Sequence, residues 1–226
     1  MIIVTGASQG IGFEIATRLH EKGESVLGLS RNSQNQKFRT ENVDVSNFKD
    51  LKKISDRIRN SNEYISSVIN VAGVASMNMA LMANPETSEK LVKINFLGTV
   101  YSSQIFAPLL IRNGGGVILN FSSIAAAINI EGEAVYAATK SAVETYSKTL
   151  AKELSKFRIR VNCIAPGPIK TNLLRGVSDN QVTKIIESQI VQQQYTAADV
   201  ANIVELLLDD RASSISGQVI HIGGFR

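Results

Sequence analysis

The chain has 226 residues, of which 44% are hydrophobic and 19% charged, a composition typical of a globular protein rather than a disordered, collagenous or low-complexity chain. Its net charge of +4 comes from scattered basic residues, so we expect neither nucleic acid nor an acidic membrane as a partner. One cysteine, Cys163, excludes an intrachain disulfide, and with only two histidines we expect no metal site. The length fits a single domain spanning residues 1–226.

The sequence shows no pattern typical of a targeting peptide. Residues 2–5 already have the apolar character of a core strand, so we expect no cleaved segment ahead of the fold. We also find no apolar run near the ~20 residues that cross a bilayer. These observations favour a soluble protein of a reducing compartment, the cytoplasm.

Apolar runs of strand length alternate with helical patterns along the whole chain. In chain order, strands are expected at 2–5, 25–29, 42–45, 66–71, 117–121, 159–164 and near 218–222. Helices are expected after the first strand, where Ile11, Ile15 and Leu19 recur, and at 47–60, about 86–112, about 135–156 and 197–208. The alternation predicts an α/β fold, a single doubly wound parallel sheet of the Rossmann type with helices on both faces. Ligands of such sheets bind beyond the carboxyl ends of the strands.

A glycine-rich turn follows the first expected strand and opens the first helix. It reads Thr5-Gly6-Ala7-Ser8-Gln9-Gly10-Ile11-Gly12. Glycines let the backbone approach a pyrophosphate closely, and the helix N-terminus offers N–H groups and a positive dipole end to the anion. The spacing is G-x-x-x-G-x-G, and the alternative is a tight strand–helix turn without a ligand. Its position between strand and helix favours a dinucleotide site.

The end of the second expected strand bears on the choice of dinucleotide. An acidic residue there would bind the 2′-hydroxyl of NAD, but this chain has Ser30-Arg31-Asn32. Arg31 is suited to pair with a 2′-phosphate, with Ser8 or Ser30 adding hydroxyl donors. An ordinary surface arginine is the alternative. We therefore favour NADP(H), with NAD(H) as the second choice.

Tyr136 and Lys140 lie four residues apart near the start of a helix, so they share one helical face. A tyrosine has a pKa of ~10 and is a weak acid–base group at neutral pH. A nearby ammonium stabilises the phenolate and lowers that pKa. The pair is a candidate proton donor and its tuner, although Y-x-x-x-K alone is a common pattern.

Further motifs accompany this pair at corresponding places along the chain. Ser122-Ser123, Asn70-Val71-Ala72-Gly73 and the segment 166–171 each follow an expected strand, and Asn95 lies within a helix. From Thr5 to Gly224 the whole pattern resembles the short-chain dehydrogenase/reductase family. The resemblance implies an NAD(P)-dependent oxidoreductase that transfers hydride between nicotinamide and a carbonyl or alcohol, without a metal.

The same resemblance implies roles for individual residues. Tyr136 would be the general acid in reduction and the base in oxidation, and Lys140 would lower its pKa and bind the nicotinamide ribose. Ser123 would orient the substrate carbonyl, with Ser122 supporting the turn, and Asn95 would hold a water beside the lysine. The implied cofactor-binding residues are Gly6, Ser8, Gly10, Ile11, Gly12, Arg31, Asp44, Val45, Asn70, Ala72, Gly73, Tyr136, Lys140, Pro166, Gly167, Ile169 and Thr171.

Within the family, the C-terminal half is most similar to the 3-oxoacyl-[acyl-carrier-protein] reductases of fatty acid biosynthesis, in the stretches 171–181 and 216–224. Arg175 falls where those reductases have a basic residue that meets the acidic carrier protein, and a solvated arginine is the alternative. The chain departs from them between Arg31 and Asp44, where twelve residues leave little or no helix. For Asp44 and Val45, which match an adenine-binding pair, a helix-entry cap is the alternative.

Three functions follow from these motifs. The first is an NADPH-dependent 3-oxoacyl thioester reductase, with acyl carrier protein as a partner. The second is a dehydrogenase or reductase of another small ketone, sugar alcohol or steroid-like alcohol. The third is a non-catalytic dinucleotide sensor, which the retained site residues disfavour. The long helices resemble the family's subunit contacts and imply a homotetramer or homodimer. Met77, Met79 and Met82 either line an apolar substrate pocket or pack in a helix core.

Overall fold

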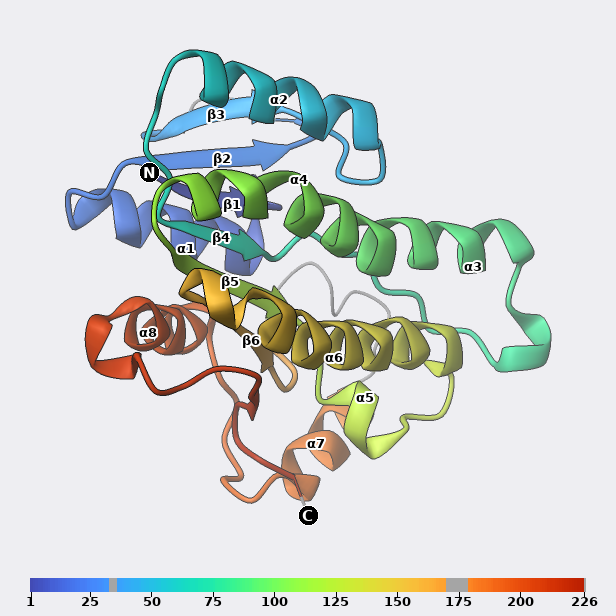
Figure 1. Cartoon of the computed structure of the whole chain (residues 1–226). Coiled ribbons are helices and arrows are strands. Elements are labelled where there is room, and N and C mark those ends of the chain that lie inside the picture. The colour runs from blue at the N-terminus through green and yellow to red at the C-terminus, as the bar shows by residue number, and fades with distance from the viewer. Residues whose placement is uncertain (33–35, 170–178, 226) are drawn as a thin grey trace.

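Seven strands form one parallel sheet in the computed structural model, which describes residues 1–32, 36–169 and 179–225 (Figure 1). Their order across the sheet is β3-β2-β1-β4-β5-β6-β7, and every neighbouring pair is parallel. The chain reverses its direction of progress between β1 and β4, the switch point at which such sheets bind ligands. The strands are β1 (Ile2–Thr5), β2 (Val26–Ser30), β3 (Arg39–Asn42), β4 (Ser67–Asn70), β5 (Gly116–Phe121), β6 (Ile159–Ala165) and β7 (Val219–His221).

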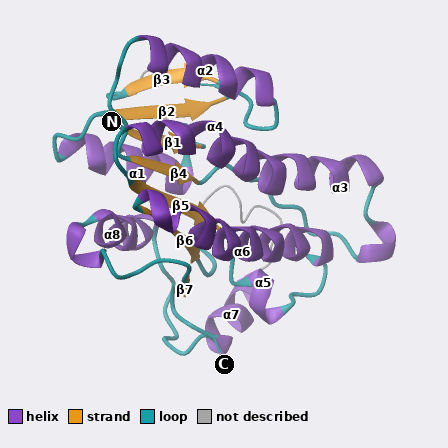
Figure 2. Cartoon of the chain, in the orientation of Figure 1, coloured by secondary structure: helices purple, strands orange, loops and turns teal. Residues whose placement is uncertain are grey.

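Helices cover both faces of this sheet, as the sequence pattern predicts (Figure 2). Helices α2, α4 and α6 share a core with one face, and α1 and α8 share a core with the other. Between α3 and α4 the chain continues as a π-helical segment, Val92–Leu97. The helices are α1 (Gly10–Glu21), α2 (Phe48–Asn60), α3 (Pro85–Leu91), α4 (Gly98–Arg112), α5 (Ala125–Ile128), α6 (Ala134–Leu154), α7 (Asp179–Ser188) and α8 (Ala197–Leu208).

The apolar strands feed two cores because successive side chains of a strand point to opposite faces. Ile3 of β1 and Ile118 of β5 belong to the core under α2, α4 and α6. Their chain neighbours Val4 and Leu119 belong to the core under α1 and α8. All four side chains are fully buried. A strand buried on both faces therefore reads as a continuous apolar run, which is the pattern of this sequence.

The third strand lies at 39–42, so the prediction of a strand at 42–45 is wrong by three residues. Of the apolar residues that suggested it, Val43 directly follows β3, donates its N–H to the Ser30 carbonyl at 2.8 Å and packs in the core under α2, α4 and α6. Val45 is buried from the loop beyond it. The Asp44 carboxylate accepts hydrogen bonds from the backbone N–H and hydroxyl of Ser46, which turns the chain toward α2. No helix lies between β2 and β3 among the described residues 31–32 and 36–38, as expected from the short spacing.

The helical run Pro85–Arg112 is long and apolar enough to cross a membrane by length and composition alone. This run corrects the expectation that the sequence has no apolar stretch near the ~20 residues that cross a bilayer. Of its most apolar window, 56% is buried inside the fold. Phe106 and Leu110 of α4, for example, are fully buried in the core shared with the sheet. The apolar character of this run is therefore accounted for by core packing.

Cys163, the chain's one cysteine, lies in β6 within the sheet and is fully buried. Burial raises the pKa of its thiol to about 12, with a further increase from the charge of Glu144. This cysteine is a structural residue of the core, because a thiol in such surroundings is almost entirely protonated at physiological pH.

Replacing Phe106 with alanine tests the importance of the core under α4. Phe106 is the largest fully buried side chain among the described residues, so the substitution removes its burial and leaves a cavity. We expect the free energy of unfolding, measured by urea denaturation, to fall by about 3–5 kcal/mol. Leu206→Ala on α8, where the side chain is 55% exposed, serves as the control and should cost much less. Equal losses in the two variants would contradict a central place for Phe106 in the core.

Candidate active site

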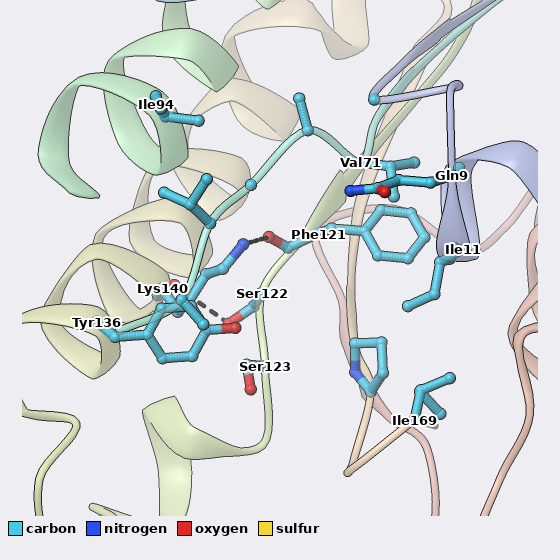
Figure 3. A pocket seen from close by; sticks show the side chains of 18 of the residues that line it. Gln9, Ile11, Val71, Ile94, Phe121, Ser122, Ser123, Tyr136, Lys140 and Ile169 are labelled. Carbon is cyan, nitrogen blue, oxygen red and sulfur yellow. Dashed lines mark hydrogen bonds between the residues drawn. The ribbon is translucent and has the colours of Figure 1, made fainter. Parts of the chain in front are cut away.

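A cavity of about 290 Å³ lies beyond the carboxyl ends of the central strands, where the fold class predicts a ligand site (Figure 3). Segments that follow β1, β2, β4, β5 and β6 all contribute to its walls, together with the start of α6. Of the predicted site residues, Gly6, Ser8, Gly10, Ile11, Gly12, Arg31, Asp44, Val45, Ala72, Gly73, Ser123, Tyr136, Lys140, Pro166, Gly167 and Ile169 line it.

The glycine turn is tightly constrained by its neighbours. Gly6 has a φ of +72°, and a Cβ there would lie 2.9 Å from the backbone of Ala72 after β4. A Cβ on Gly12 would lie 2.4 Å from the carbonyl oxygen of Gly6. Only glycine fits these two positions without moving the backbone. The turn thereby brings the N-terminus of α1 to the cavity, where the first helical turn has no acidic residue and Gln9 makes no side-chain cap.

The end of β2 forms another wall of the cavity. Arg31 is exposed there, and Asp44 and Val45 line the same cavity from the loop after β3. Asp44 therefore has both properties that the sequence left open, since it lines the cavity and also binds Ser46 in the turn before α2. Ser30 is buried at the end of the strand and also lines the cavity.

Ser123, Tyr136 and Lys140 come together at the other end of the cavity (Figure 3). Ser123 follows β5, whereas Tyr136 and Lys140 lie one turn apart on α6. The Lys140 ammonium donates a hydrogen bond of 2.9 Å to the carbonyl oxygen of Phe121 and lies 5.8 Å from the centre of the Tyr136 ring. The hydroxyl of Ser122 donates to the backbone carbonyl of Lys140 at 3.2 Å and to Glu144 at 2.7 Å. These contacts hold α6 against the end of β5.

Burial dominates the proton affinities of this group. It raises the pKa of Tyr136 to about 12, while the hydrogen bond with Ser123 lowers that pKa and the charge of Glu133 raises it further. Burial also lowers the pKa of Lys140 to about 8. At neutral pH the tyrosine is therefore protonated and the lysine is mostly a buried ammonium with one backbone acceptor.

Asn95 does not line the cavity, but it lies just behind it in the π-helical segment. Its side-chain oxygen accepts from the N–H of Val74 at 2.8 Å, and its side-chain nitrogen donates to the Val74 carbonyl and to Thr139. A Cβ on Gly73 would meet both Asn95 Oδ1 and Lys140 Nζ within 3.5 Å. Asn95 thus fixes the loop after β4 beside the lysine, and its role in holding a water stays a prediction.

Asn70 also lies away from the cavity, in a buried polar network. Its side-chain nitrogen donates to Asn120 at 2.8 Å and to Ser103 at 3.2 Å, and Asn120 in turn donates to Ser147 of α6. The network links β4, β5, α4 and α6. The link from this region to the cavity runs instead through Thr5, whose hydroxyl accepts from the N–H of Ala72 at 3.1 Å.

Thr171 and Arg175, which the sequence places at the cofactor and the substrate, lie outside the described residues. Of the three methionines considered for the pocket, Met77 lines the cavity, whereas Met79 and Met82 are 53% and 79% exposed. Residues that sequence reasoning missed include Gln9, Val74, Ser76, Ile94, Ile124, Ile130, Glu133 and Ile185. Only Glu133 carried a usable signal, because it stands three residues before Tyr136 and so near the same side of a helix.

Comparisons with known proteins show which family this chain and its fold resemble. The family model described as enoyl-(acyl carrier protein) reductase matches residues 6–225. The chain is 32% identical to 3-oxoacyl-[acyl-carrier-protein] reductase of Buchnera aphidicola over 98% of this chain and 95% of the relative. It is 30% identical to nodulation protein G of Rhizobium meliloti, over 98% of this chain and 94% of that one.

Two solved structures extend the comparison to three dimensions. A short-chain type dehydrogenase/reductase from Mycobacterium ulcerans matches with a TM-score of 0.91 and 30% identity, covering 99% of this chain and 88% of that one. An aldohexose dehydrogenase from Thermoplasma acidophilum matches with a TM-score of 0.89 and 29% identity, covering 99% and 92%. The likeness therefore extends over nearly the whole chain.

The buried ammonium predicts how stability changes with pH. Because the pKa of Lys140 is lowered to about 8 in the folded protein, the unfolded chain binds more protons above that pH. Stability should then rise with pH as Lys140 loses its proton. We expect the free energy of unfolding of the wild type, relative to Lys140→Met, to increase by about 2 kcal/mol between pH ~7.5 and ~9.5. Urea titrations of both proteins at the two pH values measure it, and parallel pH profiles would contradict the assignment.

Proposed function

We propose that this chain, which belongs to the short-chain dehydrogenase/reductase family, is an NADPH-dependent reductase of 3-oxoacyl thioesters. Membership makes it an oxidoreductase that acts on CH–OH and C=O groups with a nicotinamide cofactor. One observation supports the proposed cofactor and reaction. Ser123, Tyr136 and Lys140 group at one end of a cavity that the glycine turn and Arg31 also line. The names of the relatives support the substrate class.

The cofactor proposal rests on the glycine turn and on Arg31, which both belong to the cavity wall. Gly6 and Gly12 pack too closely against backbone atoms to carry a side chain. No side chain at these two positions therefore stands between a pyrophosphate and the backbone N–H groups at the start of α1. Arg31, exposed at the cavity wall after β2, is placed to pair with a 2′-phosphate. When bound, the reduced nicotinamide supplies the hydride for the reaction. We propose that Ala72, Gly73, Pro166, Gly167 and Ile169 complete the binding wall.

Tyr136 is the proposed proton donor to the carbonyl oxygen of the substrate. Its raised pKa of about 12 keeps the hydroxyl protonated at neutral pH, which suits the direction of reduction. Ser123 donates a second hydrogen bond to the same oxygen and stabilises the negative charge that develops there. The Lys140 ammonium favours the phenolate left after proton transfer and thereby lowers the barrier to that transfer.

The walls around the reacting end favour a substrate with an apolar part. Ile124 directly follows Ser123, and Ile130 packs against the cluster that contains Tyr136. Ile94, Ile185 and Met77 also line the cavity. A short acyl chain fits such walls, because burying apolar surface supplies affinity without requiring hydrogen-bond partners. We further propose that acyl carrier protein presents the substrate and that Arg175 meets its acidic surface, although this residue lies outside the described part of the chain.

A second candidate function is the oxidation of a sugar or another small alcohol. The aldohexose dehydrogenase from Thermoplasma acidophilum, with a TM-score of 0.89, favours it. Tyr136 would then act as the general base, and Lys140 would lower the pKa of Tyr136. Turnover of NADP⁺ or NAD⁺ with aldohexoses, in the absence of turnover with any 3-oxoacyl thioester, would select this candidate.

The proposal includes one dinucleotide-binding domain, a cytoplasmic location and assembly into a homotetramer or homodimer, as the family resemblance implies. The long helical run 85–112 and helix α6 would form subunit contacts. Light scattering at several protein concentrations gives the assembly state directly.

Replacing Tyr136 with phenylalanine removes the proposed proton donor. With NADPH and an acetoacetyl thioester, we expect kcat to fall by about 10²–10⁴-fold while nucleotide binding is retained. Tyr146→Phe is the matched control, because Tyr146 lies on the same helix but outside the cavity. Unchanged turnover by the Tyr136→Phe variant would exclude the proposed role. If the wild type itself turns over no thioester, ketone or alcohol, the sensor function is favoured instead.

Replacing Arg31 with alanine tests the preference for NADPH. Loss of a charge-assisted hydrogen bond should lower kcat/KM for NADPH by about 10- to 100-fold and leave kcat/KM for NADH within about twofold. Lys37→Ala is the control, since Lys37 is exposed near the same segment but does not line the cavity. A wild type that prefers NADH would overturn the role of Arg31 and leave the proposed chemistry intact.

A further inference from the structure

Glu133 brings a carboxylate to the reacting end of the cavity. It directly precedes α6 and lies three residues before Tyr136, and it lines the same cavity as Tyr136 and Ser123. The residue is half-buried, and its side chain does not cap the helix that it precedes. The carboxylate is therefore not used to start the helix and remains available to the cavity.

This carboxylate is unpaired among the described residues. No hydrogen bond or ion pair joins it to another side chain in that part of the chain, whereas Asp44, the other acidic residue of the cavity wall, binds Ser46. Lys140, whose ammonium lies 5.8 Å from the centre of the Tyr136 ring, donates instead to the carbonyl of Phe121. Burial raises the pKa of Glu133, as expected for a carboxylate with few partners.

The surroundings of Glu133 allow its negative charge to act on the reacting centre. Apolar side chains contribute to the cavity walls at this end, among them Ile130, which packs against the cluster that contains Tyr136, and such side chains do not screen a charge. The charge of Glu133 also raises the pKa of Tyr136, so the two groups interact electrostatically. A second negative charge brought beside Tyr136 would be repelled in these surroundings.

We propose that Glu133 is a specificity-determining residue that admits neutral 3-oxo esters and thioesters and excludes free 3-oxo acids. The inference rests on the proposed function, because that function places the reacting carbonyl at Tyr136. A free 3-oxo acid has a carboxylate two carbons from its reacting carbonyl, whereas a thioester is neutral at that position. The site therefore distinguishes a substrate attached to its carrier from the same acyl group released by hydrolysis.

The test compares two substrates that differ in charge, ethyl acetoacetate and acetoacetate, in the wild type, Glu133→Gln and Glu131→Gln. Glutamine keeps the size of the side chain and removes its charge. In Glu133→Gln we expect the ratio of kcat/KM for the ester to that for the acid to fall by about tenfold, mainly through faster reduction of the acid. A change in the pKa of Tyr136 affects both substrates alike, so the ratio isolates the charge effect.

Glu131→Gln is the matched control, because Glu131 is exposed two residues away and does not line the cavity. It makes the same change in net charge and should leave the ratio unchanged. An equal change in both variants, or an unchanged ratio in Glu133→Gln, would overturn the inference while turnover of the ester still supports the proposed function.

Binding to the cofactor-loaded protein separates failure of the inference from failure of the proposed function. If the wild type reduces neither the ester nor an acetoacetyl thioester, the proposed function fails, and isothermal titration with the same two ligands decides the inference. Tighter binding of the ester, with the preference reduced in Glu133→Gln, supports the role of Glu133. Equal binding of acid and ester by the wild type, or no binding of either, overturns it.

Discussion

The hydrogen bond from the buried Lys140 ammonium to the Phe121 carbonyl joins helix α6 to the carboxyl end of β5. A charge in such a place needs an acceptor, and the last residue of the strand supplies it. This contact fixes the start of α6, and with it the position of Tyr136 relative to Ser123. The geometry of the site therefore depends on the contact between the end of β5 and helix α6. This contact lies at the carboxyl edge of the parallel sheet, where such folds bind their ligands.

Buried polar contacts behind the cavity support this arrangement from the other strands. The Asn70–Asn120 pair joins β4 to β5 inside the sheet, and Asn95 holds the loop after β4 through both backbone groups of Val74. The side-chain nitrogens of Asn70, Asn120 and Asn95 all donate to protein acceptors, because an unpaired donor at this depth would be costly. Residues that carry no reacting atom thus determine where the reacting side chains lie.

The order of elements and most of the cavity wall were predictable from the sequence because both depend on local patterns. Apolar periodicity located β5 and α6, and the glycine turn located the start of α1. The third strand was misplaced because a buried loop residue such as Val43 has the same apolar signal as a strand residue. The spacing of Glu133 and Tyr136 places them near the same side of a helix, but only the folded chain shows that Glu133 lines the cavity. Thr171 and Arg175 lie outside the described residues, so the sequence resemblance is the basis for both.

The burial of Cys163 gives the molecule an internal reporter of its own opening. A thiol without solvent contact and with a pKa of about 12 does not react with soluble thiol reagents while β6 stays in the sheet. Because the chain has no second cysteine, any labelling comes from molecules in which this part of the sheet has separated. The rate of thiol modification thus measures exposure of the sheet interior, and a dinucleotide that binds only the folded form would slow that rate in proportion to its occupancy.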